Sequence, residues 1–509
     1  MVEDKFMGMK GDEGGKEGRG GKRRKSLYVV IFTFALSILL TLGINHPASA
    51  APRYYTEIEF PPLPEVKLPN FTRYQLPNGL LVYLVEDHEL PFVSGTALIR
   101  VGDRWEPANQ VGLGELTGSV LRTGGTKQHT GDELNQLLEQ TAASVETGIS
   151  GESGSGSFSS LTEDTEKVFS LFVEILTQPV FNQEKLNLAR SQLRGNIARR
   201  NDNPEGILSR EFTNLIYGVD SPYARSTEYT TVDRIDRESI IKFYQQYFHP
   251  NNMILGISGD FDPQQMQKLI AEKLGSWPAN PQLQLPPLPK VEQANLGGVF
   301  FVQQPQLNQS FVQLGHLGGF LKDPDYAVLD VVNNIMNSFG GRLFNEVRSR
   351  QGLAYSVYGY WSPRFDYPGV FVAGGQTRSE TTVPFIKGIF GEIDRLRTSP
   401  INDAELIRAK DSTLNSFIFN FQTPAQTLSR LMRYEYYGYP QDFIFQYQRR
   451  VAATTIADVQ RAAKTYLQPE KMVTLVVGNQ AAIQPPLTTI NPEVKAIDIT
   501  IPSGGEERK

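Results

Sequence analysis

The sequence predicts an α+β protein with two homologous domains, each an antiparallel β-sheet with helices packed on one face. Two observations lead to this prediction. The stretch from Tyr247 to Gly259 resembles the stretch from Tyr466 to Gly478 without gaps, and each copy reads as a helix end, a turn and an apolar strand. Within each half of the chain, segments with the period of a strand alternate with segments that have the period of a helix.

Local signals place individual elements in the first half. Asn78-Gly79 between two apolar runs predicts a tight β-hairpin. Thr130 followed by Glu133 matches a capping box and predicts the start of a helix. Residues 148–160 are rich in Gly and Ser and read as a pair of strands. A stripe with helical spacing predicts one further amphipathic helix: Val168, Leu171, Phe172, Ile175 and Leu176.

Proline-rich stretches set the predicted domain boundaries. Residues 51–70 read as an extended N-terminal segment and residues 278–297 as an interdomain linker. The N-terminal domain then spans residues 71–277 and the C-terminal domain residues 298–483. The remaining residues, 484–509, read as a tail that we expect to fray.

Residues 1–50 read as a secretory signal peptide. The basic run Lys22–Lys25 precedes the apolar run Leu27–Leu42, and Ala48-Ser49-Ala50 then offers a cleavage site. The apolar run is shorter than the roughly 20 residues that span a bilayer. We therefore expect export to the periplasm or cell envelope, with an uncleaved membrane anchor as the alternative.

Composition excludes several functional classes. The chain has 509 residues and a formal net charge of −5, whereas a general nucleic-acid-binding surface would be basic. It contains 0 cysteines, so it has no disulfide, thiol nucleophile or thiolate metal ligand. What remains is a globular protein with ample chain for two sizeable cores.

The hairpin at Asn78-Gly79 and the later segment 112–126, Gly-Leu-Gly-Glu-Leu-Thr-Gly-Ser-Val-Leu-Arg-Thr-Gly-Gly-Thr, resemble the insulinase/pitrilysin-type (inverzincin) zinc peptidases. In that family this segment carries H-x-x-E-H, two zinc-binding His with a Glu base between them. The resemblance assigns these three places to Glu115, Gly118 and Ser119. A catalytic zinc takes three protein ligands, and this segment offers one carboxylate and no imidazole.

The rest of the chain does not restore the metal site. No two of its histidines have the spacing of an H-x-x-E-H motif. The resemblance implies a further Glu ligand on a later helix, but the corresponding stretch, Leu193–Ile197, has no carboxylate. Ser119 has no His or Asp at a recognisable spacing, so nothing supports a serine hydrolase. We therefore expect no metal or other cofactor in this chain, and zinc only in a partner subunit. The five histidines are His46, His88, His129, His249 and His316.

The second half carries a second family signature. The segment from Phe344 to Tyr358 reads Phe-Asn-Glu-Val-Arg-Ser-Arg-Gln-Gly-Leu-Ala-Tyr-Ser-Val-Tyr. The resemblance implies that Arg348 and Tyr355 face a zinc ion across the chamber of an active peptidase. An arginine and a tyrosine hydroxyl are donors that can stabilise charge on a substrate carbonyl. Gly352 is expected to end the helix that bears Arg348.

In two-subunit members of this family, one chain carries the zinc motif and the other the Arg/Tyr pair. The sequence therefore predicts an insulinase-type fold and a non-catalytic subunit of a heterodimeric zinc peptidase. Its Arg348 and Tyr355 would assist in trans, and its partners would be a homologous zinc-bearing subunit and an extended or unfolded peptide, held by edge-strand pairing. The alternative is a catalytically inert scaffold or peptide-binding protein of the same fold.

Overall fold

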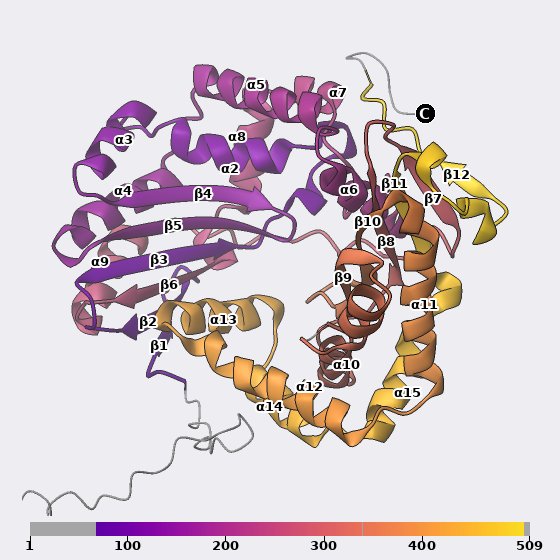
Figure 1. Ribbon diagram of the computed structural model, residues 1–509. Helices are drawn as coiled ribbons and strands as arrows, with labels where there is room; N and C mark the ends of the chain where they lie inside the picture. The colour runs from indigo at the N-terminus through magenta and orange to yellow at the C-terminus, as the bar shows by residue number, and fades with distance from the viewer. Residues whose placement is uncertain (1–67, 338, 503–509) are drawn as a thin grey trace, which may run out of the picture. The chain divides into compact units, whose positions relative to one another are not determined.

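The computed structural model describes residues 68–337 and 339–502, which form two six-stranded sheets (Figure 1). The first sheet has the strand order β1-β2-β6-β3-β5-β4 and the second β12-β7-β11-β8-β10-β9. Both are mainly antiparallel, so the predicted α+β class is confirmed. β2 nevertheless pairs in parallel with β6, and β7 with β11 and β12, because the chain returns to the sheet after a run of helices.

The strands have the following bounds. In the first sheet they are β1 Thr72–Gln75, β2 Leu81–Glu86, β3 Phe92–Ile99, β4 Ser144–Ser150, β5 Ser153–Leu161 and β6 Met253–Gly259. In the second sheet they are β7 Val299–Gln303, β8 Gln309–Leu317, β9 Ala354–Ser362, β10 Val370–Arg378, β11 Val473–Gly478 and β12 Val494–Ala496. The repeated strand predicted from the sequence is thus β6 in one sheet and β11 in the other, and each has the same place in its strand order.

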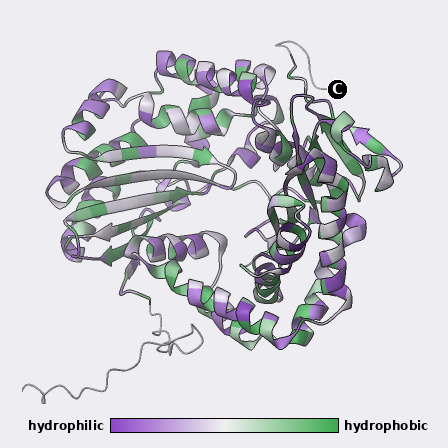
Figure 2. Ribbon diagram, viewed as in Figure 1, coloured by the Kyte–Doolittle hydropathy of each residue, from purple (hydrophilic) through white to green (hydrophobic). Residues whose placement is uncertain are grey.

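The helices lie between these strands in the chain. In the first half they are α2 Leu113–Thr123, α3 Gly131–Glu139, α4 Thr165–Thr177, α5 Gln183–Arg199, α6 Pro204–Tyr217, α7 Tyr229–Asp233, α8 Arg237–Tyr247 and α9 Pro263–Leu274. In the second half they are α10 Tyr326–Asn337, the wide-turned η6 Leu343–Arg350, α11 Thr382–Thr398, α12 Asp403–Ser416, α13 Pro424–Tyr437, α14 Phe443–Ala453 and α15 Ile456–Tyr466. Figure 2 shows many of them striped, with one hydrophobic and one hydrophilic side.

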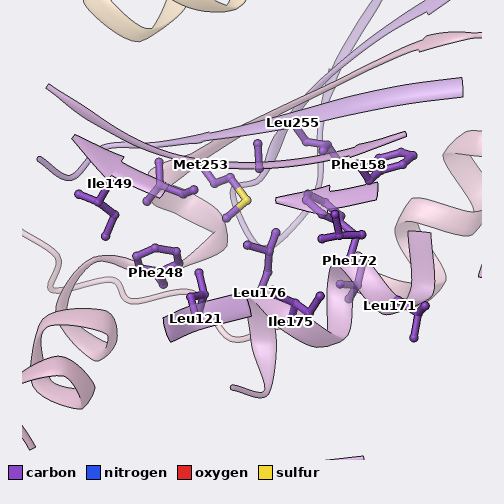
Figure 3. Close-up of a cluster of buried hydrophobic side chains, with 14 of the residues drawn as sticks. Leu121, Ile149, Phe158, Leu171, Phe172, Ile175, Leu176, Phe248, Met253 and Leu255 are labelled. Atoms are coloured by element: carbon purple, nitrogen blue, oxygen red, sulfur yellow. The ribbon is translucent and has the colours of Figure 1, made fainter. Parts of the chain in front are cut away.

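Each sheet buries one face against helices of its own half. In the first half the predicted stripe lies on α4, where Phe172 and Leu176 meet Phe158 of β5 and Leu255 of β6 (Figure 3). The hairpin at Gly79 forms with φ +89° and joins β1 to β2. The capping box at Thr130 begins α3. In the second half α10, α11 and α15 build the corresponding core.

The opposite face of each sheet is covered by one helix from the other half. α6 belongs to the first half of the sequence, yet its Ile207 and Phe212 pack on β8 and β11 of the second sheet. α13 belongs to the second half, and its Leu431 and Met432 pack on β2 and β6 of the first sheet. Gly256 of β6 makes this approach possible, since a Cβ there would lie 2.2 Å from the Met432 sulfur. Each half therefore completes the core of the other.

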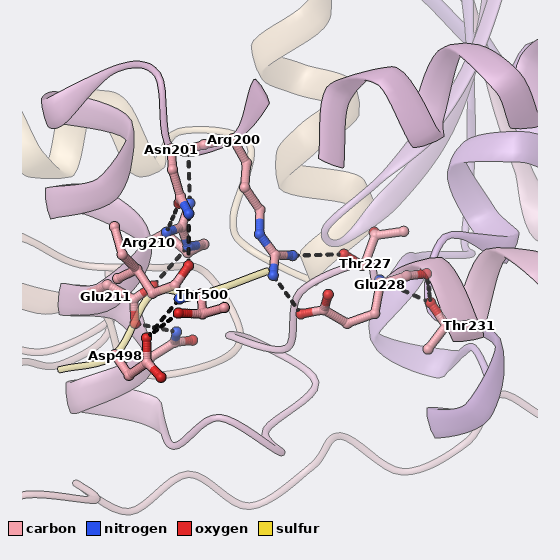
Figure 4. Close-up of polar contacts among 11 residues, drawn as sticks. Arg200, Asn201, Arg210, Glu211, Thr227, Glu228, Thr231, Asp498 and Thr500 are labelled. Carbon is pink, nitrogen blue, oxygen red and sulfur yellow. Dashed lines mark hydrogen bonds and ion pairs between the residues drawn. The ribbon is translucent and has the colours of Figure 1, made fainter. Parts of the chain in front are cut away.

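The C-terminal segment also joins this packing, so the expectation of a frayed tail is wrong for its described part. β12 adds to the second sheet beside β7, and Ile497 and Ile499 pack on the core that contains α6. The Asn201 amide donates to the Ile499 carbonyl at 2.7 Å, and Figure 4 shows the flanking Asp498 and Thr500 beside Arg210 and Glu211 of α6. These apolar and backbone contacts hold the segment because they remove alternating isoleucines from water.

The predicted signal peptide lies outside the described residues, as does most of the segment 51–70. Residues 278–297 contain no helix or strand. Among the described helices, none combines the length and the apolar character that crossing a bilayer requires.

Candidate functional site

The three places of the degenerate zinc motif lie together on α2. Glu115 is in its first turn and exposed, Gly118 is buried, and Ser119 is half-buried. The exposed Glu115 carboxyl borders a cavity whose walls partly desolvate it, and this, with the nearby Asp103, raises its pKa. A lone carboxylate of this kind can accept a hydrogen bond but cannot by itself hold a catalytic zinc ion.

The place of the catalytic base is filled by main chain. A Cβ built on Gly118 would lie 2.4 Å from the Ile149 nitrogen and 2.7 Å from the Gly148 carbonyl carbon, both in β4. No real Cβ fits at such distances, so α2 lies directly against the edge of its own sheet. The Thr147 hydroxyl donates to the Gly118 carbonyl at 2.6 Å and fastens the two elements. Position 118 therefore lacks the glutamate side chain of the zinc motif, and the main chain of β4 occupies the space that such a side chain would need.

The neighbouring helix supplies no metal ligand either. Leu193 and Ile197 of α5 face the core, and no atom lies within 4 Å of a Cβ built on Gly195. Across the described ranges, no group of three or more His, Asp or Glu side chains is arranged to hold a metal ion. The residues around α2 do not fit zinc.

The four described histidines have structural partners. His88 bonds Asp260 at 2.5 Å and His129 bonds Glu174 at 3.0 Å. His249 lies 2.7 Å from the carbonyl of Gln245, while His316 contacts the Leu317 carbonyl at 2.7 Å and is buried. Each imidazole is thus held by a local bond of its own element or a neighbouring one. His46 lies outside the described residues.

The cavity beside Glu115 has a volume of about 470 Å³ and mixed charge. Its wall includes the buried Glu106, whose carboxylate accepts hydrogen bonds from the Gly112 and Gly114 amides at the start of α2. Burial raises the pKa of Glu106 to about 7. Arg225 faces the same cavity and donates to the Glu106 carbonyl at 2.7 Å. Glu106 acts as a buried cap for α2, a role that the sequence did not reveal.

The two halves meet at this cavity. Arg104 is buried and pairs with Asp366 of the second half through two contacts, at 3.0 and 2.9 Å. Tyr223 stacks on Tyr367 with ring centroids 4.1 Å apart. Neither Arg348 nor Tyr355 lines this cavity. The structure therefore separates the α2 site from the Arg/Tyr pair within one chain.

Arg348 and Tyr355, the pair that the family resemblance singled out, lie close together. Arg348 lies on η6 and Tyr355 on β9, and Gly352 between them has φ +61°, the left-handed conformation expected where the helix ends. The Arg348 guanidinium carbon lies 4.6 Å from the Phe344 ring centroid and 5.5 Å from that of Tyr355. Tyr355 is 83% exposed. Within the described part of the chain, the Arg348 side chain has no hydrogen bond or ion pair, so its donors remain available.

The edge of β9 is closed at one end and open at the other. Asn333 and Asn337, one turn apart on α10, each bond both the N–H and the C=O of a β9 residue, Trp361 and Gly359 respectively. Backbone groups of alternate residues point the same way along an edge strand, so those of Val357 face outward too, whereas the register shift opposite Gln376 and Thr377 interrupts the alternation before Tyr355. No described residue bonds the outward groups of Val357. In the sequence, the spacing Asn-x-x-x-Asn places both side chains on one face of α10, and this was the signal that could have indicated the contact with β9.

Comparison with known proteins identifies the family of this chain. Residues 81–230 match the family description "Insulinase (Peptidase family M16)", and residues 234–413 match "Peptidase M16 inactive domain". The chain belongs to peptidase family M16, the insulinase family. The resemblance predicted from the hairpin, the α2 segment and the Arg/Tyr segment is confirmed.

Individual M16 relatives differ in what their names state. An "Uncharacterized zinc protease" of Rickettsia bellii is 25% identical over 67% of this chain and 81% of its own length. The "Non-peptidase homolog YmxG" of Helicobacter pylori is 23% identical over 78% of this chain and 91% of its own. This chain is thus similar both to a protein named as a protease and to one named as a non-peptidase.

Solved M16 structures share the fold. A peptidase M16 inactive domain from Pseudomonas fluorescens is 25% identical, with a TM-score of 0.71, and covers 82% of this chain and 100% of its own. The periplasmic protease PqqL from Escherichia coli is 16% identical, with a TM-score of 0.68, over 82% of this chain and 46% of its own. The predicted insulinase-type architecture is therefore confirmed at the level of the fold.

Proposed function

We propose that this chain is the non-catalytic subunit of a heterodimeric M16 metallopeptidase of the cell envelope. The observation that carries the proposal is the contrast between the two halves. In the first half α2 is packed against β4 where a catalytic base would stand. In the second half Arg348 and Tyr355 lie together at the surface, with donor groups that no described residue uses.

Arg348 and Tyr355 would act on a substrate held between the two subunits. The Arg348 guanidinium carries a fixed positive charge and several N–H donors, and the Tyr355 hydroxyl is a directed donor. Phe344 and Tyr355 flank the guanidinium and restrict its freedom before a substrate arrives. Both groups would stabilise charge that develops on a peptide carbonyl oxygen while the zinc of the partner subunit activates water.

The open end of β9 would help to hold the substrate. The outward backbone groups of Val357, two residues from Tyr355, can pair with an extended peptide, whereas Asn337 closes the strand at Gly359. Pairing over this short stretch would place a peptide carbonyl beside Tyr355. The substrate class that fits is an extended or unfolded polypeptide.

The proposed partner is a homologous subunit that carries the zinc motif. The order of basic, apolar and small residues before Ala51 supports export, and the fold shared with a periplasmic protease is compatible with it. We therefore place the heterodimer in the periplasm or cell envelope.

The second candidate is a catalytically inert scaffold or peptide-binding protein. The similarity to a protein named as a non-peptidase homologue favours it. In that case Arg348 and Tyr355 would be dispensable for the activity of any peptidase that binds this chain.

Reconstitution with the zinc-bearing partner separates the two candidates. The wild-type pair should cleave peptides, whereas this chain alone should not. Arg348→Ala or Tyr355→Phe should lower the turnover of the assembled pair by roughly a hundredfold, because each removes one donor to the developing oxyanion. Turnover is measured per complex isolated by size exclusion.

Two controls sharpen this test. Tyr360→Phe changes another exposed tyrosine of β9, and Arg408→Ala changes an exposed arginine of α12, and both should leave turnover unchanged. Wild-type turnover in both the Arg348 and the Tyr355 variant would assign the chain to the scaffold class. Loss of assembly with normal turnover per complex would give these residues a structural role.

A further inference from the structure

The segment from Val494 to Ile501 crosses from one half of the molecule to the other. It starts as β12, which pairs in parallel with β7 at the edge of the second sheet. Ile497 and Ile499 then pack on the core that contains α6, and Ile501 packs on the core of the first half. Because these residues contact both halves within one short stretch, we call residues 494–501 the strap.

The strap has the pattern of a strand that is held from one side only. Its isoleucines are half-buried, whereas Asp498 and Thr500 between them are exposed. The Ile497 amide donates to the Phe301 carbonyl of β7 at 2.8 Å, and in the described sheet β12 has no neighbouring strand other than β7. An edge segment with few buried contacts opens locally at a lower free energy than the strands inside the sheet.

Asn201, in the turn between α5 and α6, fastens the strap to the first half. Its side-chain N–H donates to the Ile499 carbonyl at 2.7 Å, and its side-chain oxygen accepts from Arg210 at 2.8 Å (Figure 4). The bond from Arg210 fixes the orientation of the amide group and so directs its N–H at the strap. Arg210 also lines the cavity beside Glu115, where the two halves meet.

The strap makes a contact that the exchanged helices do not make. α6 and α13 each cover the sheet of the opposite half, whereas the strap joins β7 of the second sheet to the core of the first half. β12 also covers the outer edge of β7. Release of the strap would therefore remove one connection between the halves and uncover a strand edge, to which another extended strand can add.

We propose that the strap is a releasable lock between the two halves, with Asn201 as its latch. The closed strap ties β7 to the core of the first half and covers the edge of β7. The open strap frees that edge while the rest of the fold stays native. This lock depends only on contacts within the chain, so it is independent of the function proposed above.

Limited trypsin digestion measures how often the strap opens. Lys495 lies in β12, and a protease cuts such a bond only after the segment has opened. Between Lys471 and Arg508 it is the sole lysine or arginine, so the loss of residues 496–509 from the intact mass identifies this cut. In the wild-type chain it should appear before cuts inside the other described helices and strands.

Two variants weaken the lock at different points, and a third is the matched control. Asn201→Asp keeps the acceptor for Arg210 but loses the N–H donor to Ile499, and it should speed the cut at Lys495 by about tenfold. Ile501→Ser weakens the contact with the first half and should speed this cut by roughly tenfold too. Asn415→Asp makes the same change of charge on an exposed residue of α12 and should leave the rate unchanged.

Three outcomes would overturn the proposal. Cuts inside the other helices and strands that appear as fast as the cut at Lys495 would show that the strap opens only when the whole chain unfolds. An unchanged rate in Asn201→Asp would show that Asn201 is not a latch. An unchanged rate in Ile501→Ser would show that the strap belongs to the second sheet alone. Circular dichroism spectra check that each variant is folded before digestion.

Discussion

A single methyl group at Gly118 tests whether α2 has closed against its sheet. Gly118→Ala introduces a Cβ 2.4 Å from the Ile149 nitrogen and 2.8 Å from the Gly148 Cα. Both atoms are main chain in β4, which is paired with β5, so the strand cannot yield as a flexible side chain would. Either α2 or β4 must shift, and overpacking of this kind costs about 1–3 kcal/mol of unfolding free energy.

The matched control is Gly195→Ala. Both glycines lie inside helices, so both substitutions gain the same helix propensity, about 1 kcal/mol. A Cβ on Gly195 has no neighbour within 4 Å, and the control should therefore be stabilised. The difference between the two variants isolates the contact with β4, and we expect Gly118→Ala to be less stable by about 1–3 kcal/mol.

Urea denaturation followed by circular dichroism measures this difference, provided that the slopes of the two transitions agree. If Gly118→Ala is stabilised as much as Gly195→Ala, α2 does not lie against β4 and the site is not closed. The same reasoning extends to the triple variant Glu115→His, Gly118→Glu, Ser119→His. It should not form a stoichiometric zinc site, because a glutamate at position 118 has less room still.

The sequence predicted those parts of the molecule that depend on local chemistry. The Asn78-Gly79 hairpin forms because Gly79 tolerates the positive φ of the turn. The pair of strands in the Gly- and Ser-rich stretch appears as β4 and β5. Arg348 and Tyr355 meet because Gly352 turns the chain between η6 and β9. Each of these depends on residues close together in the chain.

The sequence did not predict which sheet each helix covers. The pattern of α6 shows that Ile207 and Phe212 share an apolar face. Because the hydrophobic effect is not directional, this face could be buried equally well against either sheet. The exchange of α6 and α13 is settled only by the shape of the assembled halves, for example by Gly256, which admits the Met432 sulfur. The alternating isoleucines that follow β12 are packed for the same reason, although the prolines before them suggested a frayed end.

The candidate site shows the same division. The resemblance of the sequence to the insulinase family placed Glu115, Gly118 and Ser119 at the positions of the zinc motif. It thereby showed which residues replace the two zinc-binding histidines and the glutamate base. It did not show that β4 fills the space beside Gly118, because β4 is separated from α2 by a further helix in the chain. The bonds from Asn333 and Asn337 to β9 were also missed, since asparagine inside a helix carries no single meaning.

Two further predictions concern the contact between the halves and the start of α2. Phe212→Ala should cost about 3–5 kcal/mol and, because α6 covers the second sheet, should speed amide hydrogen exchange in β8 and β11; faster exchange confined to β3 and β6 would contradict this packing. Burial raises the pKa of Glu106 from 4.5 to about 7, so the folded protein holds a proton that the unfolded chain releases. This contribution to stability is complete below pH 4.5 and is lost as the pH rises through 7, by up to about 3 kcal/mol. Glu106→Gln keeps an acceptor for the Gly112 and Gly114 amides but does not ionise, and its stability should therefore fall less than that of the wild type between pH 5 and 8. Urea midpoints across this range, parallel in the two proteins, would show that Glu106 is not the group that titrates.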